Sequence, residues 1–180
     1  MWETFNQVFD LLPIAAIIDG QIFCAHGGIP VTVSNLQQVI NLIPCPMHAP
    51  EEQSQCAWEM LWNDPLSKFS YTQHRTTLEA VGSLPRNLPL GCLPNFRRDT
   101  GYFFTDEAVQ AFLKVNKLSM VIRGHEVQEL GFSIHFGGQL ITCFSCSMYC
   151  GSKNSAAAVL VAGGRVRPIK IDTFASPNNF

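Results

Sequence analysis

The chain of 180 residues is poor in charged side chains, and the charges that it carries nearly cancel. Asp, Glu, Lys and Arg make up 14% of the residues, and the formal net charge is −2. Binding to a phosphate backbone needs an excess of Lys and Arg, so we expect no nucleic-acid partner. Long apolar runs are also missing, since residues 14–18 are followed by Asp19-Gly20. We therefore expect no membrane-spanning segment and no membrane partner.

The N-terminus has neither the basic start nor the long apolar block of a secretory signal. The number of cysteines is seven, and several lie in apolar, strand-like surroundings. A free thiol behaves there as a small hydrophobe, so we expect a reduced, intracellular protein. Cys143-x-x-Cys146 has no second pair at zinc-finger spacing, and we favour structural cysteines over a zinc site.

Hydrophobic residues are abundant, at 47%, and their spacing alternates between helical and strand-like. Apolar residues at helical spacing predict helices over residues 2–12, 34–43, 51–61 and 105–115. Short apolar runs bounded by turn residues predict strands over residues 14–18, 21–24, 118–122, 131–136, 140–145, 156–161 and 165–171. This order favours a mixed α/β (α+β) domain in which antiparallel strands dominate the second half.

Residues 66–97 differ from the rest of the chain. Pro85, Pro89 and Pro94 interrupt them, polar residues are scattered throughout, and no long apolar run occurs. We predict a long surface loop or an insertion here.

Two histidines stand beside glycine, each directly after a strand-like run. His26 lies in Cys24-Ala25-His26-Gly27-Gly28, and His125 lies in Arg123-Gly124-His125-Glu126. Glycine lets the backbone turn sharply, and a histidine on a loop that leaves a buried strand can bind a metal at the edge of the sheet. We predict that both histidines contribute to one metal site.

Other polar segments in loops could complete such a site. Arg97-Arg98 offers forked donors for phosphate oxygens, Asn63-Asp64 follows a predicted helix, and Tyr149 follows a predicted strand. A metal beside an arginine is a common arrangement for hydrolysing phosphate esters.

The strongest pattern is a set of segments that recur in a fixed order. They are Trp2-Glu3-Thr4-Phe5, Leu12-Pro13-Ile14-Ala15-Ala16, residues 22–28, Leu61-Trp62-Asn63-Asp64-Pro65, Gly101-Tyr102-Phe103-Phe104 after Arg98, residues 123–126 and residues 140–151. In these segments the sequence resembles the metal-dependent serine/threonine protein phosphatases, the group of the type-1, type-2A and calcineurin enzymes. The resemblance implies a partial calcineurin-like metallophosphoesterase β-sandwich with flanking helices. Residues 1–180 would be the C-terminal half of its catalytic domain.

The resemblance also implies roles for individual residues. His26 and His125 would be ligands of one of two adjacent metal ions, and Arg98 would bind the substrate phosphate, with Arg97 as the alternative in register. Tyr149 would overhang the cleft.

Two further positions follow from the same resemblance. Asn63-Asp64 would line the cleft, with Asn63 where the family usually has serine. Arg123 would lie in the structural layer behind His125.

Three motifs of the family do not occur in this sequence: Gly-Asp-x-His-Gly, Gly-Asp-x-Val-Asp-Arg-Gly and Gly-Asn-His-Glu. In the family they supply the remaining ligands of two manganese, iron or zinc ions, which activate water to hydrolyse phosphoserine and phosphothreonine. We therefore expect a truncated site that is inactive alone, in a cytoplasmic or nuclear protein that acts on phosphoproteins and binds regulatory subunits. The alternative is a non-catalytic phosphatase-like decoy or scaffold that binds phosphatase regulators.

Overall fold

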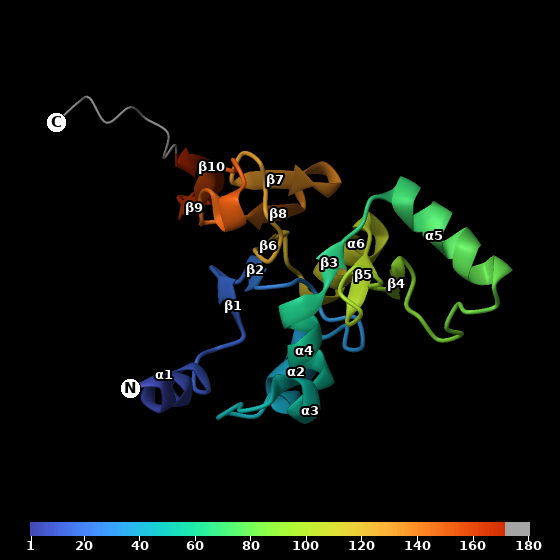
Figure 1. The fold of residues 1–180 in the computed structure, drawn as a ribbon, viewed down its shortest axis with the longest axis horizontal. Coiled ribbons are helices and arrows are strands. Elements are labelled where there is room, and N and C mark those ends of the chain that lie inside the picture. The colour runs from blue at the N-terminus through green and yellow to red at the C-terminus, as the bar shows by residue number, and fades with distance from the viewer. Residues whose placement is uncertain (172–180) are drawn as a thin grey trace.

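The structure is a computed structural model that describes residues 1–171, without the side chain of residue 42 (Figure 1). Its central sheet has the order β1-β2-β6-β8-β7. The strands are β1 (Ala15–Ile18), β2 (Ile22–Ala25), β6 (Met120–Arg123), β8 (Leu140–Cys143) and β7 (Phe132–His135). The three middle strands are parallel, and β1 and β7 are antiparallel to their neighbours. Because β2 and β6 are parallel neighbours, the loops that follow them leave the same edge of the sheet.

Two smaller sheets complete the strands. One has the order β3-β5-β4, and the other is an antiparallel hairpin. Their strands are β3 (Asp64–Pro65), β5 (Tyr102–Phe104), β4 (Cys92–Pro94), β9 (Ala156–Ala162) and β10 (Arg165–Ile171). The strands predicted from the sequence are confirmed, with ends that shift by one or two residues.

Helices flank these sheets, as the mixed α/β prediction requires. They are α1 (Trp2–Phe9), α2 (Leu36–Leu42), α3 (Pro50–Gln53), α4 (Gln55–Trp62), α5 (Lys68–Ala80) and α6 (Asp106–Asn116), with 3₁₀ turns η1 (Phe136–Gly138) and η2 (Tyr149–Gly151). None of these helices is long and apolar enough to cross a membrane.

Some helix bounds differ from the prediction. The helix predicted over 2–12 ends at Phe9, and the helix predicted over 34–43 begins at Leu36, because the Asn35 side chain caps it by accepting a hydrogen bond from the backbone N–H of Gln37. The helix predicted over 51–61 is two helices, since Ser54 has an extended backbone and caps α4 through the N–H of Ala57.

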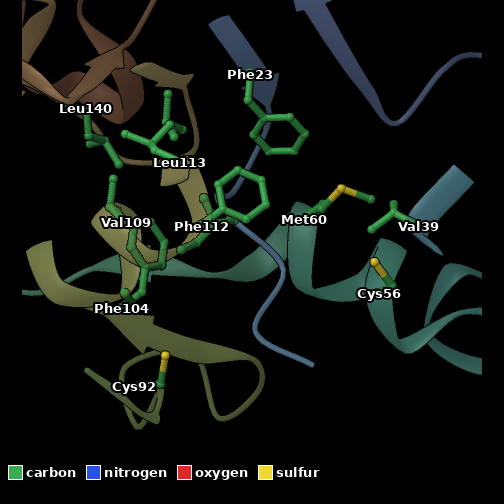
Figure 2. Close-up of a cluster of buried hydrophobic side chains, with 13 residues drawn as sticks. Phe23, Val39, Cys56, Met60, Cys92, Phe104, Val109, Phe112, Leu113 and Leu140 are labelled. Atoms are coloured by element: carbon green, nitrogen blue, oxygen red, sulfur yellow. The ribbon is translucent and has the colours of Figure 1, made fainter. Parts of the chain in front are cut away.

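The main core lies between the central sheet and the helices α4 and α6 (Figure 2). Phe23 of β2 meets Phe112 of α6 edge to face, with ring centroids 5.1 Å apart. Met60 of α4 and Leu140 of β8 are buried in the same cluster. The core therefore ties β2 to the helix that precedes β6, and so holds the two predicted histidine loops at a fixed separation.

The sequence predicts a long surface loop or an insertion over residues 66–97. The insertion stays a prediction, whereas a surface loop is wrong for much of this segment. It contains α5 and β4, and Ser67 caps α5 by accepting from the N–H of Ser70. Leu66, Tyr71 and Leu93 pack with Phe103 in a second small core. The helix escaped prediction because Tyr71 is the only buried residue of α5, so no apolar stripe is visible in its sequence.

An apolar surface remains open near the N-terminus. No residue of α1 is buried, and Trp2 is 78% exposed. Phe5 and Phe9 are also exposed on this helix, which lies at the opposite end of the molecule from α5 (Figure 1). Apolar surface of this extent favours contact with other apolar groups over contact with water.

Candidate functional site

His26 and His125 come together at the edge of the central sheet. They follow the parallel strands β2 and β6, whose last residues, Ala25 and Arg123, are paired. His125 Nδ1 lies 3.1 Å from His26 Nε2, and the N–H of Gly124 donates to the carbonyl of His26 at 2.9 Å. The structure thus brings together two imidazoles that are 99 residues apart in the sequence.

The backbone around both histidines is tightly constrained. His125 adopts a left-handed conformation with φ of 62°, which is uncommon for a residue other than glycine. A Cβ at Gly27 would lie 2.5 Å from the backbone carbon of Leu61, so only glycine fits there. The N–H of Gly27 donates to the carbonyl of Met60 at the end of α4, and this fixes the loop that carries His26.

Asp64 joins two arginines beside the histidine pair. Its Oδ2 accepts from Arg98 Nε at 3.0 Å, and its Oδ1 accepts from Arg123 Nη2 at 2.7 Å. The Asn95 side chain donates to the same carboxylate at 2.9 Å. Burial alone would raise the pKa of Asp64, but the donors Arg98 and Asn95 and the charge of Arg123 outweigh it and lower that pKa. Asp64 is therefore an ionised anchor for both arginines.

Arg123 lies behind the pair, with its side chain fully buried. It donates to the carbonyl of Gly27, to the carbonyl of Asn63 at 3.2 Å and to Glu126 at 2.9 Å. These contacts connect the His26 loop with the segment after α4 and with the residue that follows His125. This is the layer that the resemblance implies for Arg123.

Both imidazoles have lowered pKa values. Burial lowers the pKa of His125 to about 4, and the charges of Arg98 and Arg123 and the nearby His26 add to the effect. Burial, Arg123 and Arg98 also lower the pKa of His26. Both rings are consequently neutral near pH 7, which is the form that binds metal ions.

His125 Nε2 is a buried polar atom without a hydrogen-bond partner. Such atoms are rare in folded proteins, and in a histidine that faces a second histidine they suit a metal ligand. Within residues 1–171, however, no group of three or more His, Cys, Asp or Glu side chains could hold an ion. The described residues thus fit two ligands of one metal ion.

The structure separates the two candidate arginines. Arg98 bonds to Asp64, and its Nη2 reaches the carbonyl of His125 at 3.5 Å. Arg97 instead stacks over the Phe103 ring, with Cζ 4.6 Å from the ring centroid, and its Nη1 lies 3.4 Å from Glu126 Oε1. Of the two, Arg98 is the one that adjoins the histidine pair.

Tyr149 lies on η2 and is 47% exposed. Its ring lies edge to face with the Phe144 ring, with centroids 5.2 Å apart, and its backbone N–H donates to the Asn154 side chain. These contacts fix the position of Tyr149 in its own loop, and its place over a cleft stays a prediction.

Trp62 is a neighbour of the site that the sequence reasoning did not single out. Its ring stands at 88° to that of His125, with centroids 5.3 Å apart. Trp58 packs against Trp62 and donates from Nε1 to Thr100 at 2.7 Å. The sequence offered one signal for Trp62, because this residue directly precedes Asn63-Asp64 in a segment that resembles the phosphatase family.

Comparison with known proteins identifies the family that the chain resembles. The family model described as calcineurin-like phosphoesterase matches residues 1–129. The serine/threonine-protein phosphatase BSL2 of Arabidopsis thaliana is 33% identical over 164 residues, which cover 91% of this chain and 14% of that protein.

A solved structure shares the fold. It is a protein serine/threonine phosphatase from Saccharomyces cerevisiae with similarity to human phosphatase PP5, with a TM-score of 0.72 and 24% identity. The match covers 98% of this chain and 52% of that chain. The chain thus spans about half the length of this relative and a smaller part of the plant phosphatase.

Proposed function

The chain belongs to the calcineurin-like phosphoesterase family, and on this premise we propose that it takes part in the hydrolysis of phosphoserine and phosphothreonine in proteins. One observation carries the proposal. The neutral imidazoles of His26 and His125 converge, with 3.1 Å between Nε2 and Nδ1, beside Arg98, which a buried carboxylate holds in place. A hydrolase of phosphate esters needs both a metal ligand set and a cation for the phosphate.

Arg98 binds and orients the phosphate group. Asp64 occupies its Nε and the His125 carbonyl accepts from Nη2, which leaves Nη1 and the second N–H of Nη2 for phosphate oxygens. Asp64 is buried and Arg98 is partly exposed, so the anchor is inside the protein and the donor end is accessible.

His26 and His125 are the residues that would hold a metal ion, of which manganese, iron or zinc suits imidazole. In a two-metal site the bound ions supply an activated water and offset charge on the phosphate. Two imidazoles alone bind a divalent ion weakly. We therefore propose that further ligands must join this pair for turnover, and that the 180-residue chain alone hydrolyses phosphoproteins poorly or not at all. Regulatory subunits would bind the assembled enzyme.

Fluorescence tests the metal role, because the Trp62 ring lies 5.3 Å from the His125 ring. Titration with MnCl₂ should quench tryptophan emission in the unaltered chain, and His125→Ala should remove this quenching. His74→Ala is the matched control, since His74 packs against Phe96 outside the site. Equal quenching in the unaltered chain and in His125→Ala would refute the metal role.

A phosphopeptide tests the phosphate role. Arg98→Gln should abolish the preference of the chain for a phosphoserine peptide over its unphosphorylated form, measured by fluorescence anisotropy with manganese present. Arg86→Gln removes a charge from an exposed position and should leave that preference unchanged. Phosphate release from the peptide by the chain alone, abolished by His125→Ala, would contradict the proposed dependence on further ligands.

A further inference from the structure

Asn63 connects the two loops that carry the proposed metal ligand and the proposed phosphate-binding arginine. Its Nδ2 donates to the carbonyl of Ile29 at 2.9 Å, three residues after His26. Its Oδ1 accepts from the N–H of Tyr102 at 2.7 Å, four residues after Arg98. One side chain therefore spans two segments that are 73 positions apart (from 29 to 102).

The Asn63 backbone is held as firmly as its side chain. The N–H of Asn63 donates to the carbonyl of Glu59 at 2.9 Å, and its carbonyl accepts from the buried guanidinium of Arg123 at 3.2 Å. The residue is fully buried. Because the oxygen and nitrogen of the side chain and both backbone polar groups have a partner, and the residue is buried, these bonds favour one arrangement of Asn63.

The chemistry of the amide fits this position. The Ile29 carbonyl needs a donor and the Tyr102 N–H needs an acceptor, and an Asn side chain offers both at its tip. A Cβ at Gly101 would lie 2.9 Å from Asn63 Oδ1, so the approach of this loop also depends on glycine. Serine, the residue that the family resemblance leads one to expect, has a shorter side chain with a single polar atom.

We propose that Asn63 is a positioning residue, which sets the place of Arg98 relative to His26 and His125. This inference rests on the proposed function, because it assigns Asn63 a purpose only if Arg98 binds phosphate. The bond from Tyr102 holds the start of β5, and the bond to Ile29 holds the segment that follows His26. The loop that carries Arg98 therefore has one end at Tyr102 and the other at Asn95, whose side chain is bonded to Asp64. Without the amide, the Arg98 guanidinium keeps Asp64 and the His125 carbonyl as partners, but the loop that carries Arg98 loses its attachment at Tyr102.

The test compares Asn63→Ala with Asn116→Ala. Asn116 makes the same kind of bridge, since its Oδ1 accepts from the N–H of Leu36 and its Nδ2 donates to the carbonyl of Ser34, but it lies at the end of α6 outside the site. Inorganic phosphate is titrated into each chain in the presence of a low concentration of ZnCl₂, a diamagnetic ion that leaves nearby resonances visible, and the Nε–Hε resonance of Arg98 is followed by NMR. Thermal unfolding is measured alongside. We expect both variants to lower the unfolding temperature and only Asn63→Ala to weaken phosphate binding, by about tenfold, with a shifted Arg98 resonance.

Each outcome has a defined meaning. Equal phosphate affinity in Asn63→Ala and the unaltered chain, with Arg98→Gln unable to bind, overturns the role of Asn63 and leaves the proposed function standing. Phosphate binding that is absent from the unaltered chain, or unchanged in Arg98→Gln, overturns the proposed function and this inference with it. If Asn63→Ala does not fold, Asn63→Asp keeps the acceptor for Tyr102 and removes the donor to Ile29, and the same comparison applies to it.

Discussion

The low pKa of His125 predicts that the metal-free protein loses stability as the pH falls below neutrality. The ring is neutral in the folded chain down to a pH of about 4, whereas in the unfolded chain it takes up a proton near its ordinary value of 6.5. Between these values the unfolded state binds more protons than the folded state. Stability is therefore complete above pH 6.5 and is lost as the pH falls toward 4.

The size of the effect follows from the two pKa values. The difference between the folded and the unfolded pKa of His125 lowers the free energy of unfolding by roughly 3 kcal/mol below pH 4, and by about 2 kcal/mol at pH 5. The His125 side chain is only 9% exposed, so solvent screens little of this energetic effect. His26 and His135 also have lowered pKa values and add to the loss, whereas the raised pKa of the Glu126 carboxyl opposes it. The pKa of Asp64 is shifted below 3.8, outside this window.

The assay is urea unfolding at several pH values between 5 and 8, in buffer that contains a chelator. His125→Gln cannot titrate, so its unfolding free energy should fall by about 2 kcal/mol less over this range than that of the unaltered chain. His74→Ala serves as the control, because the His74 ring packs against Phe96 and not against either site histidine. Parallel pH profiles for His125→Gln and the unaltered chain would refute the assignment of the pH dependence to His125.

Three further predictions concern the site, the second core and the open surface. Asp64→Asn leaves the buried Arg123 without one of its two carboxylates and should lower the unfolding free energy by about 3 kcal/mol in urea titrations; a loss below about 1 kcal/mol would show that the pair is not buried as described. Tyr71→Ala removes the only buried side chain of α5 and should expose residues 68–80 to hydrogen exchange while β6 stays protected, whereas uniform exposure would mean that the two cores unfold together. Phe5→Ser on α1 should change the unfolding free energy by less than about 0.5 kcal/mol and reduce binding of an apolar dye, and a large loss of stability would contradict the exposure of that helix.

The elements that sequence reasoning located are those with a local signal. The strands around His26 and His125 are apolar runs that end at glycine, and α6 has an apolar stripe through Val109 and Phe112. In each case the residues that make the pattern are the residues that the fold buries, so periodicity and burial agree.

The loop prediction over residues 66–97 failed because residues that are distant in the sequence stabilise part of that segment. The helix α5 exists because Tyr71 packs with Leu93 and Phe103, which follow it by more than twenty positions. No pattern within residues 68–80 indicates this contact. Local composition favoured a loop, whereas tertiary packing stabilises a helix there.

The site shows the same division between local and distant signals. Both histidines were identified by their glycine neighbours, and Arg98 by the resemblance. The bridge made by Asn63 and the contact of Trp62 with His125 join segments that are distant in the sequence, so no local pattern encodes them. A buried amide with two distant partners is visible only once the two segments are placed together.

The contacts around the histidine pair indicate a site that is arranged before any ligand arrives. His125 is held at positive φ, and Arg123 ties the loop of His26 to the segment of Asp64. These supports are buried and mutually satisfied, so they do not depend on a metal ion for their order. Under the proposed roles, a preset pair of neutral imidazoles would lose little conformational entropy on binding an ion, and a preset arginine would lose little on binding phosphate. The described residues supply two convergent imidazoles and an anchored arginine, and they include no group of three or more possible metal ligands.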